Sequence, residues 1–214
     1  MTLQSHYKLD NAPVKIVQDA IDIWNSISHD TKNNPDIKFY RQAAENLGHY
    51  SLGKNLSKYT HFRDHFLEVS SEEPCLVEFY VGCPKHYISS PHTDRGRKVA
   101  INIPIEVDLD KSTAFFGKYS DLSKYPQHKP DQLALGALFS PPEVINQRYD
   151  GNYVPEYYDT AILDNPVIFN PTLPHGGSNT ADSQRVLMSL SWYTFSYETA
   201  ISKLSKLGWI SELS

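Results

Sequence analysis

The residue types best suited to chemistry in this chain lie in two short stretches far apart in the sequence. The first contains His92 and Asp94, two residues apart, and the second contains His175 within residues 173–177. On an extended backbone, side chains at positions i and i+2 point to the same face, so His92 and Asp94 can bind one metal ion together. His175 offers a third ligand if the fold brings it close. These three residues are therefore candidate metal ligands; the alternative is that they are ordinary polar residues near turns.

Arg185 follows His175 by ten residues and begins the apolar run 186–193. A guanidinium group is well shaped to hold a carboxylate by two parallel hydrogen bonds. Two histidines and one carboxylate form the facial triad of non-haem Fe(II) oxygenases, which leaves coordination positions open. A buried charge is costly without a partner, so an inward-facing Arg185 implies an anionic ligand or a buried acid. The alternative is a surface arginine at the start of a strand.

Four ordered segments carry a more specific signal. Phe79-Tyr80-Val81-Gly82 is similar to a Y-x-G motif, and His92-Thr93-Asp94 to an H-x-D motif. Residues 97–103 are similar to the basic residue and apolar strand that follow, and His175 with Arg185 to a distal histidine and a cosubstrate arginine. In this order the segments resemble the Fe(II)- and 2-oxoglutarate-dependent dioxygenase superfamily, most closely the prolyl-4-hydroxylase type. They span about residues 75–192, with a poorly matched middle.

The resemblance implies a ligand set for Fe(II) and for the cosubstrate 2-oxoglutarate. Fe(II) would be bound by His92, Asp94 and His175. The far carboxylate of 2-oxoglutarate would pair with Arg185. Tyr80 would donate its phenol to the same carboxylate, although a core or surface aromatic is the equal alternative for this residue.

Two further residues complete the predicted cosubstrate pocket. Asn102 stands where the family has a residue lining that pocket, and it is a polar residue inside an apolar strand. The family's common R-x-S is absent, because Leu187 occupies that position. Ser189, four residues after Arg185, matches the Ser or Thr of the prolyl-hydroxylase type. Arg97, next to Lys98, is interpreted as a solvated turn charge.

The pattern of the chain predicts a mainly β fold with flanking α-helices. Short β-type runs bounded by Gly, Pro, Asn or Asp favour a sandwich or barrel. These runs are 76–81, 99–107, 112–116, 160–163, 166–170 and 184–196. The resemblance implies the double-stranded β-helix, a cupin-like jelly roll whose metal ligands face inward at one open end.

We expect a single domain over residues 1–214 with three parts. Residues 1–73 should form an N-terminal helical support, with one helix ending near Ser28 and a second over 39–47. Residues 74–196 should form the jelly-roll core and 197–214 a C-terminal helix stopped by Gly208. Within the core, residues 118–159 are rich in Pro and Tyr. They break the strand pattern and predict a lid-like or disordered insertion.

Composition excludes several classes of function. The formal net charge of −5 argues against a broad electrostatic grip on nucleic acid. No run of 18 apolar residues occurs, so we expect no membrane span. The first ten residues, MTLQSHYKLD, lack the apolar core of a signal peptide, and cytoplasmic residence is the default expectation.

The resemblance implies an oxidoreductase, a hydroxylase that uses O₂ and 2-oxoglutarate and releases succinate and CO₂. Its substrate would be an unidentified peptide side chain or small molecule. Two other interpretations stay open: a catalytically inactive jelly-roll binding or structural module, and a non-oxidative cupin-type metal enzyme such as an isomerase or hydrolase. The spacing of Arg185 from His175 favours the oxygenase over the non-oxidative enzyme. Nothing in the sequence separates the oxygenase from the inactive module.

Overall fold

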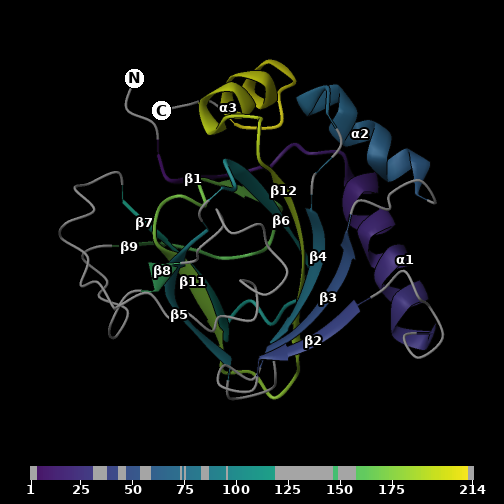
Figure 1. Cartoon of the computed structure of the whole chain (residues 1–214), viewed down its shortest axis with the longest axis vertical. Coiled ribbons are helices and arrows are strands. Elements are labelled where there is room, and N and C mark those ends of the chain that lie inside the picture. Colours follow the sequence, from purple (N-terminus) through teal and green to yellow (C-terminus); the bar gives the residue numbers. More distant parts are fainter. Residues whose placement is uncertain are drawn as a thin grey trace.

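Two antiparallel sheets form the body of the protein (Figure 1). The computed structural model describes residues 4–30, 38–42, 47–53, 59–72, 74, 76–82, 87–94, 96–118, 147–148 and 158–211. The larger sheet has seven strands in the spatial order β1 (His6–Lys8), β10 (Val167–Phe169), β6 (Val99–Glu106), β12 (Arg185–Trp192), β4 (Leu76–Gly82), β3 (Leu47–Gly53) and β2 (Lys38–Gln42). The smaller sheet has five strands in the order β8 (Gln147–Arg148), β5 (Tyr87–Thr93), β11 (His175–Asn179), β7 (Ser112–Gly117) and β9 (Tyr158–Ala161).

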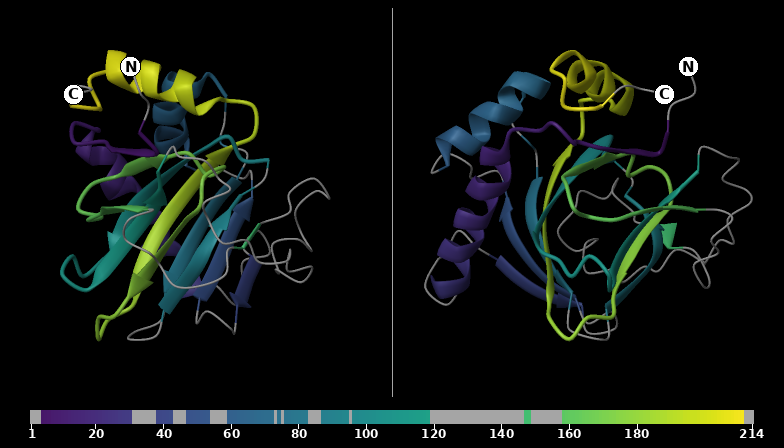
Figure 2. Two further views of the ribbon diagram at one scale, coloured as in Figure 1. Left: turned by 90° about the vertical axis from the view of Figure 1, so that its left-hand side faces the viewer. Right: turned by 180° about the vertical axis from the view of Figure 1, so that it is seen from behind.

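Among the described residues, three helices flank the seven-stranded sheet, and Figure 2 shows one of them along its outer face and two at the end of the sheet near the chain termini. The three helices are α1 (Val14–Asp30), α2 (Thr60–Ser70) and α3 (Tyr197–Lys206). Ile16 of α1, Phe66 of α2 and Leu204 of α3 belong to one buried cluster with alternate residues of the sheet. The mainly β fold with flanking helices is therefore confirmed.

Side chains of the central strand β12 alternate between the helix-covered face of the larger sheet and the space between the two sheets. Val186, Met188, Leu190 and Trp192 belong to the cluster under the helices. Leu187 instead belongs to a second cluster with Ala114 and Phe116 of the five-stranded sheet. Because side chains alternate along a strand, Arg185, Ser189 and Ser191 share the inner face with Leu187. The space between the sheets therefore receives one arginine and two hydroxyl groups from β12.

The flanking helices follow local rules that the sequence displays. In α1 the buried residues Ile16, Ala20, Ile23 and Ile27 recur at helical spacing, and Lys15 pairs with Asp19 one turn on at 2.8 Å. Ser196 caps α3 by accepting a hydrogen bond from the Thr199 N–H, and Gly208 follows that helix with φ 74°. The predicted ends of these two helices agree with the structure.

The helix predicted over residues 39–47 is wrong. Residues 38–42 and 47–53 are instead the strands β2 and β3, which pair with each other. β3 also pairs with β4, so these residues extend the seven-stranded sheet beyond the core strands. Backbone pairing with the exposed edge of β4 outweighs a weak helical pattern. The second helix of the N-terminal part is α2, which lies after these strands.

The predicted insertion 118–159 lies outside the described residues, apart from its two ends and β8. Those ends are side by side, because β7 pairs with β9 and places Gly117 opposite Tyr158. Lys118 and Asp159 form an ion pair at 3.7 Å. Both ends of the insertion therefore join the core at neighbouring strands of the smaller sheet.

Among the described residues, no helix is long and apolar enough to span a membrane. Cytoplasmic residence and the division into three parts stay predictions.

Candidate functional site

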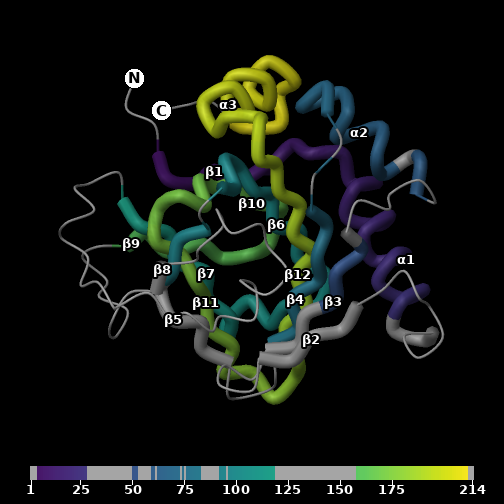
Figure 3. The backbone as a smooth tube through the Cα atoms, in the orientation of Figure 1, coloured from purple at the N-terminus to yellow at the C-terminus, as the bar shows by residue number. Residues whose placement is uncertain are grey.

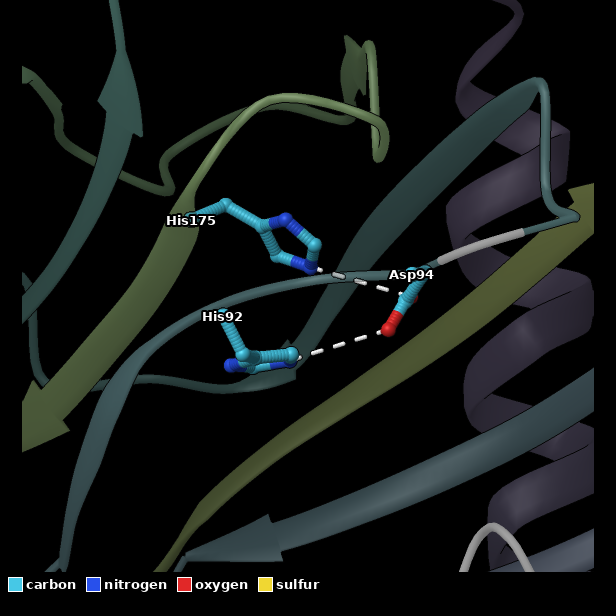
Figure 4. Close-up of side chains that lie close together, drawn as sticks. All are labelled: His92, Asp94 and His175. Carbon is cyan, nitrogen blue, oxygen red and sulfur yellow. Dashed lines mark ion pairs between the residues drawn. The ribbon is translucent and has the colours of Figure 1, made fainter. Parts of the chain in front are cut away.

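His92, Asp94 and His175 lie together between the two sheets, and both imidazole rings point toward the carboxylate (Figure 4). One ligand atom from each residue lies within 4.8 Å of the others. Asp94 Oδ1 is 3.9 Å from His92 Nε2, and Asp94 Oδ2 is 3.7 Å from His175 Nε2. This is the spacing of a set of donors that could surround one ion with bonds of about 2 Å.

Strand pairing explains how residues so distant in sequence meet. β5 and β11 are neighbours in the smaller sheet, and their register places His92 opposite His175. The two ring centroids are 4.5 Å apart. The backbone N–H of Asp94 donates a hydrogen bond of 2.8 Å to the Pro171 carbonyl, which ties the turn after β5 to the loop before β11.

The His175 ring is held in the form that a metal requires. Its Nδ1 lies 3.0 Å from the Leu173 carbonyl oxygen, which can only accept, so Nδ1 carries the proton and Nε2 keeps its lone pair. Burial, and then the neighbouring His92, lowers the pKa of His175 from 6.5 to about 4. At neutral pH His175 is therefore an uncharged imidazole, and protons do not compete with a metal for it.

The lowered pKa of His175 predicts acid sensitivity in the metal-free protein. A histidine with a folded pKa of about 4 and an unfolded pKa of 6.5 binds its proton more tightly in the unfolded chain. Stability should therefore fall as the pH drops, by about 2 kcal/mol between pH 7 and pH 5. Urea denaturation in the presence of a chelator measures this loss.

His175→Gln tests whether His175 is the titrating group. In this variant most of the loss of stability between pH 7 and pH 5 should disappear. His6 contributes in the same direction, because burial lowers its pKa as well. His6→Gln separates that contribution. An unchanged pH dependence in His175→Gln would assign the titration to another group.

Asp94 is also the end of a second buried group of charges. Arg97 donates from Nη1 to Asp94 Oδ2 at 3.1 Å and from Nη2 to Glu78 Oε2 at 3.0 Å. Burial alone would raise the pKa of Asp94, but Arg97, His175 and His92 outweigh burial and lower it below 3.8. Asp94 is therefore a carboxylate at neutral pH.

The prediction that Arg97 is a solvated turn charge is wrong. Its side chain is only 12% exposed and bridges two buried carboxylates, those of Glu78 and Asp94. Glu78 was not among the predicted site residues. The signal was an acidic residue inside the apolar strand 76–81, which needs a cationic partner once the strand is buried.

Tyr80 lies on the same inner face of β4 as Glu78, two residues away. Its hydroxyl donates to Glu78 Oε2 at 2.6 Å and lies 3.4 Å from Arg97 Nη1. Burial, and then the Glu78 carboxylate, raises the pKa of Tyr80 well above 10.0, so the phenol keeps its proton. That single proton is directed at Glu78.

Arg185 is the second buried guanidinium of the interior, with only 4% of the residue exposed. It extends from β12 of the larger sheet to Gly177 of β11 in the smaller sheet. A Cβ atom at position 177 would lie 2.5 Å from Arg185 Nη1 and 2.8 Å from the Thr113 carbonyl oxygen. Figure 3 shows the turn between β11 and β12 that carries the chain from one sheet to the other. Gly177 therefore leaves the space that the guanidinium fills.

Gly177→Ala should weaken the binding of a dicarboxylate without removing the metal site. The added methyl group collides with Nη1 of Arg185 and with a backbone carbonyl that cannot turn away. We expect the guanidinium to shift and the Kd for 2-oxoglutarate to rise by about 10-fold, the effect of losing about one charge-assisted hydrogen bond. Calorimetric titration of the Fe(II)-loaded protein under anaerobic conditions measures this change.

Gly208→Ala is the matched control for that substitution. Gly208 has φ +74° and no atom within 4 Å of a built Cβ, so alanine there strains the backbone but fills no site. It should cost about 1 kcal/mol of stability and leave the 2-oxoglutarate Kd unchanged. Equal Kd values for both alanine variants would contradict the role given to Gly177.

Ser189 and Asn102 lie on one row across the larger sheet. Ser189 is opposite Glu78 on one side and opposite Asn102 on the other. Ser189 is buried and Asn102 is half-buried. Arg185, Ser189, Asn102 and Tyr80 thus all belong to the inner face of this sheet, and their contacts with a cosubstrate stay predictions.

Comparison with known proteins gives a likeness of structure alone. No family model matches the chain, and no curated protein matches it. A Pseudomonas putida prolyl-4-hydroxylase is similar to it with a TM-score of 0.50 and 9% identity, over 89% of this chain and 91% of that one. This likeness confirms the expected jelly-roll fold.

Two other solved structures have somewhat lower TM-scores. One is the epimerase SnoN, solved with Fe3+, alpha ketoglutarate and nogalamycin RO, with a TM-score of 0.48 and 12% identity over 93% of this chain and 83% of that one. The other is EvdO2 from Micromonospora carbonacea var. aurantiaca, with a TM-score of 0.49 and 12% identity over 88% of this chain and 85% of that one.

Proposed function

We propose that the protein is an Fe(II)- and 2-oxoglutarate-dependent dioxygenase that hydroxylates a peptide side chain or a small molecule. One observation carries the proposal: His92, Asp94 and His175 converge to within 4.8 Å inside the jelly roll. Two imidazoles and one carboxylate suit Fe(II) and leave positions open on the metal for a cosubstrate and O₂. The bound iron and 2-oxoglutarate would supply the oxidation, with release of succinate and CO₂.

The buried charges support a divalent ion together with a dianion. Glu78 and Asp94 are negative, and Arg97 and Arg185 are positive, so the formal charges of these four buried side chains cancel. A divalent cation bound to this interior adds two positive charges in a medium of low polarity. A dicarboxylate cosubstrate restores neutrality, and neutrality matters because uncompensated buried charge is costly.

The side chains would perform three tasks. His92, the neutral imidazole of His175 and the ionised Asp94 would bind the metal. Arg185 would hold the far carboxylate of 2-oxoglutarate, with Ser189 and Asn102 lining the same face. The two sheets would exclude water from the reacting centre, and that exclusion strengthens each electrostatic contact inside it.

Anaerobic titration of the purified chain with Fe(II) and then 2-oxoglutarate tests the proposal. The expected result is a weak visible charge-transfer band that needs both additions. Succinate release in air, screened against peptides, amino acids and nucleobases, then identifies the substrate class. An inactive binding module would bind both ligands and release no succinate with any substrate. A non-oxidative metal enzyme would bind the metal and ignore 2-oxoglutarate.

A further inference from the structure

The most unusual feature of the interior is the buried chain of contacts behind the metal ligand Asp94. It runs from Tyr80 to Glu78, from Glu78 to Arg97, and from Arg97 to Asp94, with distances of 2.6, 3.0 and 3.1 Å. Glu78 is 4% exposed and Asp94 is 5% exposed. Tyr80, Glu78 and Arg97 are not among the predicted metal ligands. Metal binding by these residues therefore does not explain why they lie in contact with one another in the interior.

The geometry restricts how Asp94 can bind a metal. Arg97 Nη1 donates to Oδ2, the oxygen that also lies 3.7 Å from His175 Nε2, whereas Oδ1 lies 3.9 Å from His92 Nε2. An oxygen that accepts a guanidinium hydrogen bond is a poorer ligand than its free neighbour. Oδ1 is therefore the better donor, and the carboxylate is directed toward binding through one oxygen.

Arg97 also places a fixed positive charge next to the site of a cation, which it would repel. The Glu78 carboxylate, 3.0 Å from Arg97 Nη2, compensates that charge. With Glu78 present, the group formed by Glu78, Arg97 and Asp94 has a net charge of −1, the same as Asp94 alone. Without Glu78 the net charge would be zero, and the attraction of the site for a cation would fall.

We propose that Arg97 is a positioning residue that holds Asp94 for binding through one oxygen, and that Glu78, itself held by the Tyr80 hydroxyl, cancels the charge of Arg97. The inference rests on the proposed function for the identity of the metal site. It replaces the contact with 2-oxoglutarate that the sequence resemblance implied for Tyr80. Removal of Glu78 alone would leave the charge of Arg97 uncompensated beside the metal, and loss of such a supporting residue typically weakens metal binding by about 10- to 100-fold.

A charge cycle measured with Co(II) tests the inference without relying on turnover. Glu78→Gln should raise the Kd for Co(II) by at least about 10-fold. The double variant Glu78→Gln with Arg97→Met removes both charges and should recover most of that affinity. Its visible Co(II) spectrum should nevertheless differ from that of the parent, because the carboxylate is no longer held by one oxygen. Equal losses of affinity in the single and double variants would overturn the inference, as would unchanged affinity in Glu78→Gln.

Tyr80→Phe distinguishes two roles for the phenol, holding Glu78 and binding the far carboxylate of 2-oxoglutarate. It also provides a second test of the inference if Glu78→Gln does not fold. We expect the Co(II) Kd to rise a few-fold and the 2-oxoglutarate Kd of the metal-loaded protein to stay within about twofold of the parent. A 10-fold weaker 2-oxoglutarate affinity with unchanged metal affinity would make Tyr80 a cosubstrate ligand and would overturn the inference. A parent protein that binds neither Co(II) nor Fe(II) would instead refute the proposed function.

Discussion

Replacing His175 by alanine is expected to abolish Fe(II) binding and, with it, all succinate release. The substitution leaves only His92 and Asp94 of three donors that lie within 4.8 Å of one another. Loss of a group that merely supports a ligand costs about 10- to 100-fold in metal affinity, so loss of a ligand should cost more than about 100-fold. Anaerobic Fe(II) titration measures the affinity, and the visible band formed with 2-oxoglutarate should disappear.

The environment of His175 makes this variant a strict test. The side chain is only 10% exposed and its Nε2 lies 3.7 Å from Asp94 Oδ2, so alanine removes a donor from inside the site. His65→Ala on α2 provides a control, since Phe66 of that helix belongs to the buried cluster under the helices, away from the metal ligands. Parental Fe(II) affinity in His175→Ala would show that the three residues do not share a metal.

The candidate metal ligands were predictable from the sequence because their signals are local. His92 and Asp94 stand two apart on an extended backbone, and in the strand that follows them Ile101, Ile103 and Ile105 alternate with other residues. The meeting of His92 with His175 required the pairing of β5 with β11, which no local pattern displays. Only the resemblance to a known family placed them together before the structure did.

The residues that were missed share one physical reason. Whether Arg97 is solvated or buried depends on a partner far away in sequence, and Glu78 is 19 residues distant from it. Two adjacent glycines, such as Gly176 and Gly177, commonly mark a turn. In the structure Gly177 lies in the strand β11, and its missing side chain makes room for Arg185. The environments of Arg97, Glu78 and Gly177 therefore all depend on partners that are distant in the sequence.

Arg185→Met is expected to weaken 2-oxoglutarate binding by about 30- to 100-fold while leaving the Fe(II) Kd within about twofold. Methionine keeps much of the apolar stem of Arg185 and removes the guanidinium that fills the space beside Gly177. The loss corresponds to about 2–3 kcal/mol, the usual contribution of hydrogen bonds to a charged group in a buried site. Anaerobic calorimetry on the Fe(II)-loaded variant measures both constants.

A second ligand makes the Arg185 prediction specific to the far carboxylate. 2-Oxobutyrate has the same 2-oxo acid end but lacks the second carboxylate, so only 2-oxoglutarate gains from the guanidinium. The parent should therefore prefer 2-oxoglutarate strongly, and Arg185→Met should bind the two acids with similar affinity. Arg63→Met on α2, where Arg63 pairs with the exposed Asp64 at 3.1 Å, should keep the parental preference. If Arg185→Met also keeps that preference, the buried guanidinium serves the packing of the two sheets and the anion binds elsewhere.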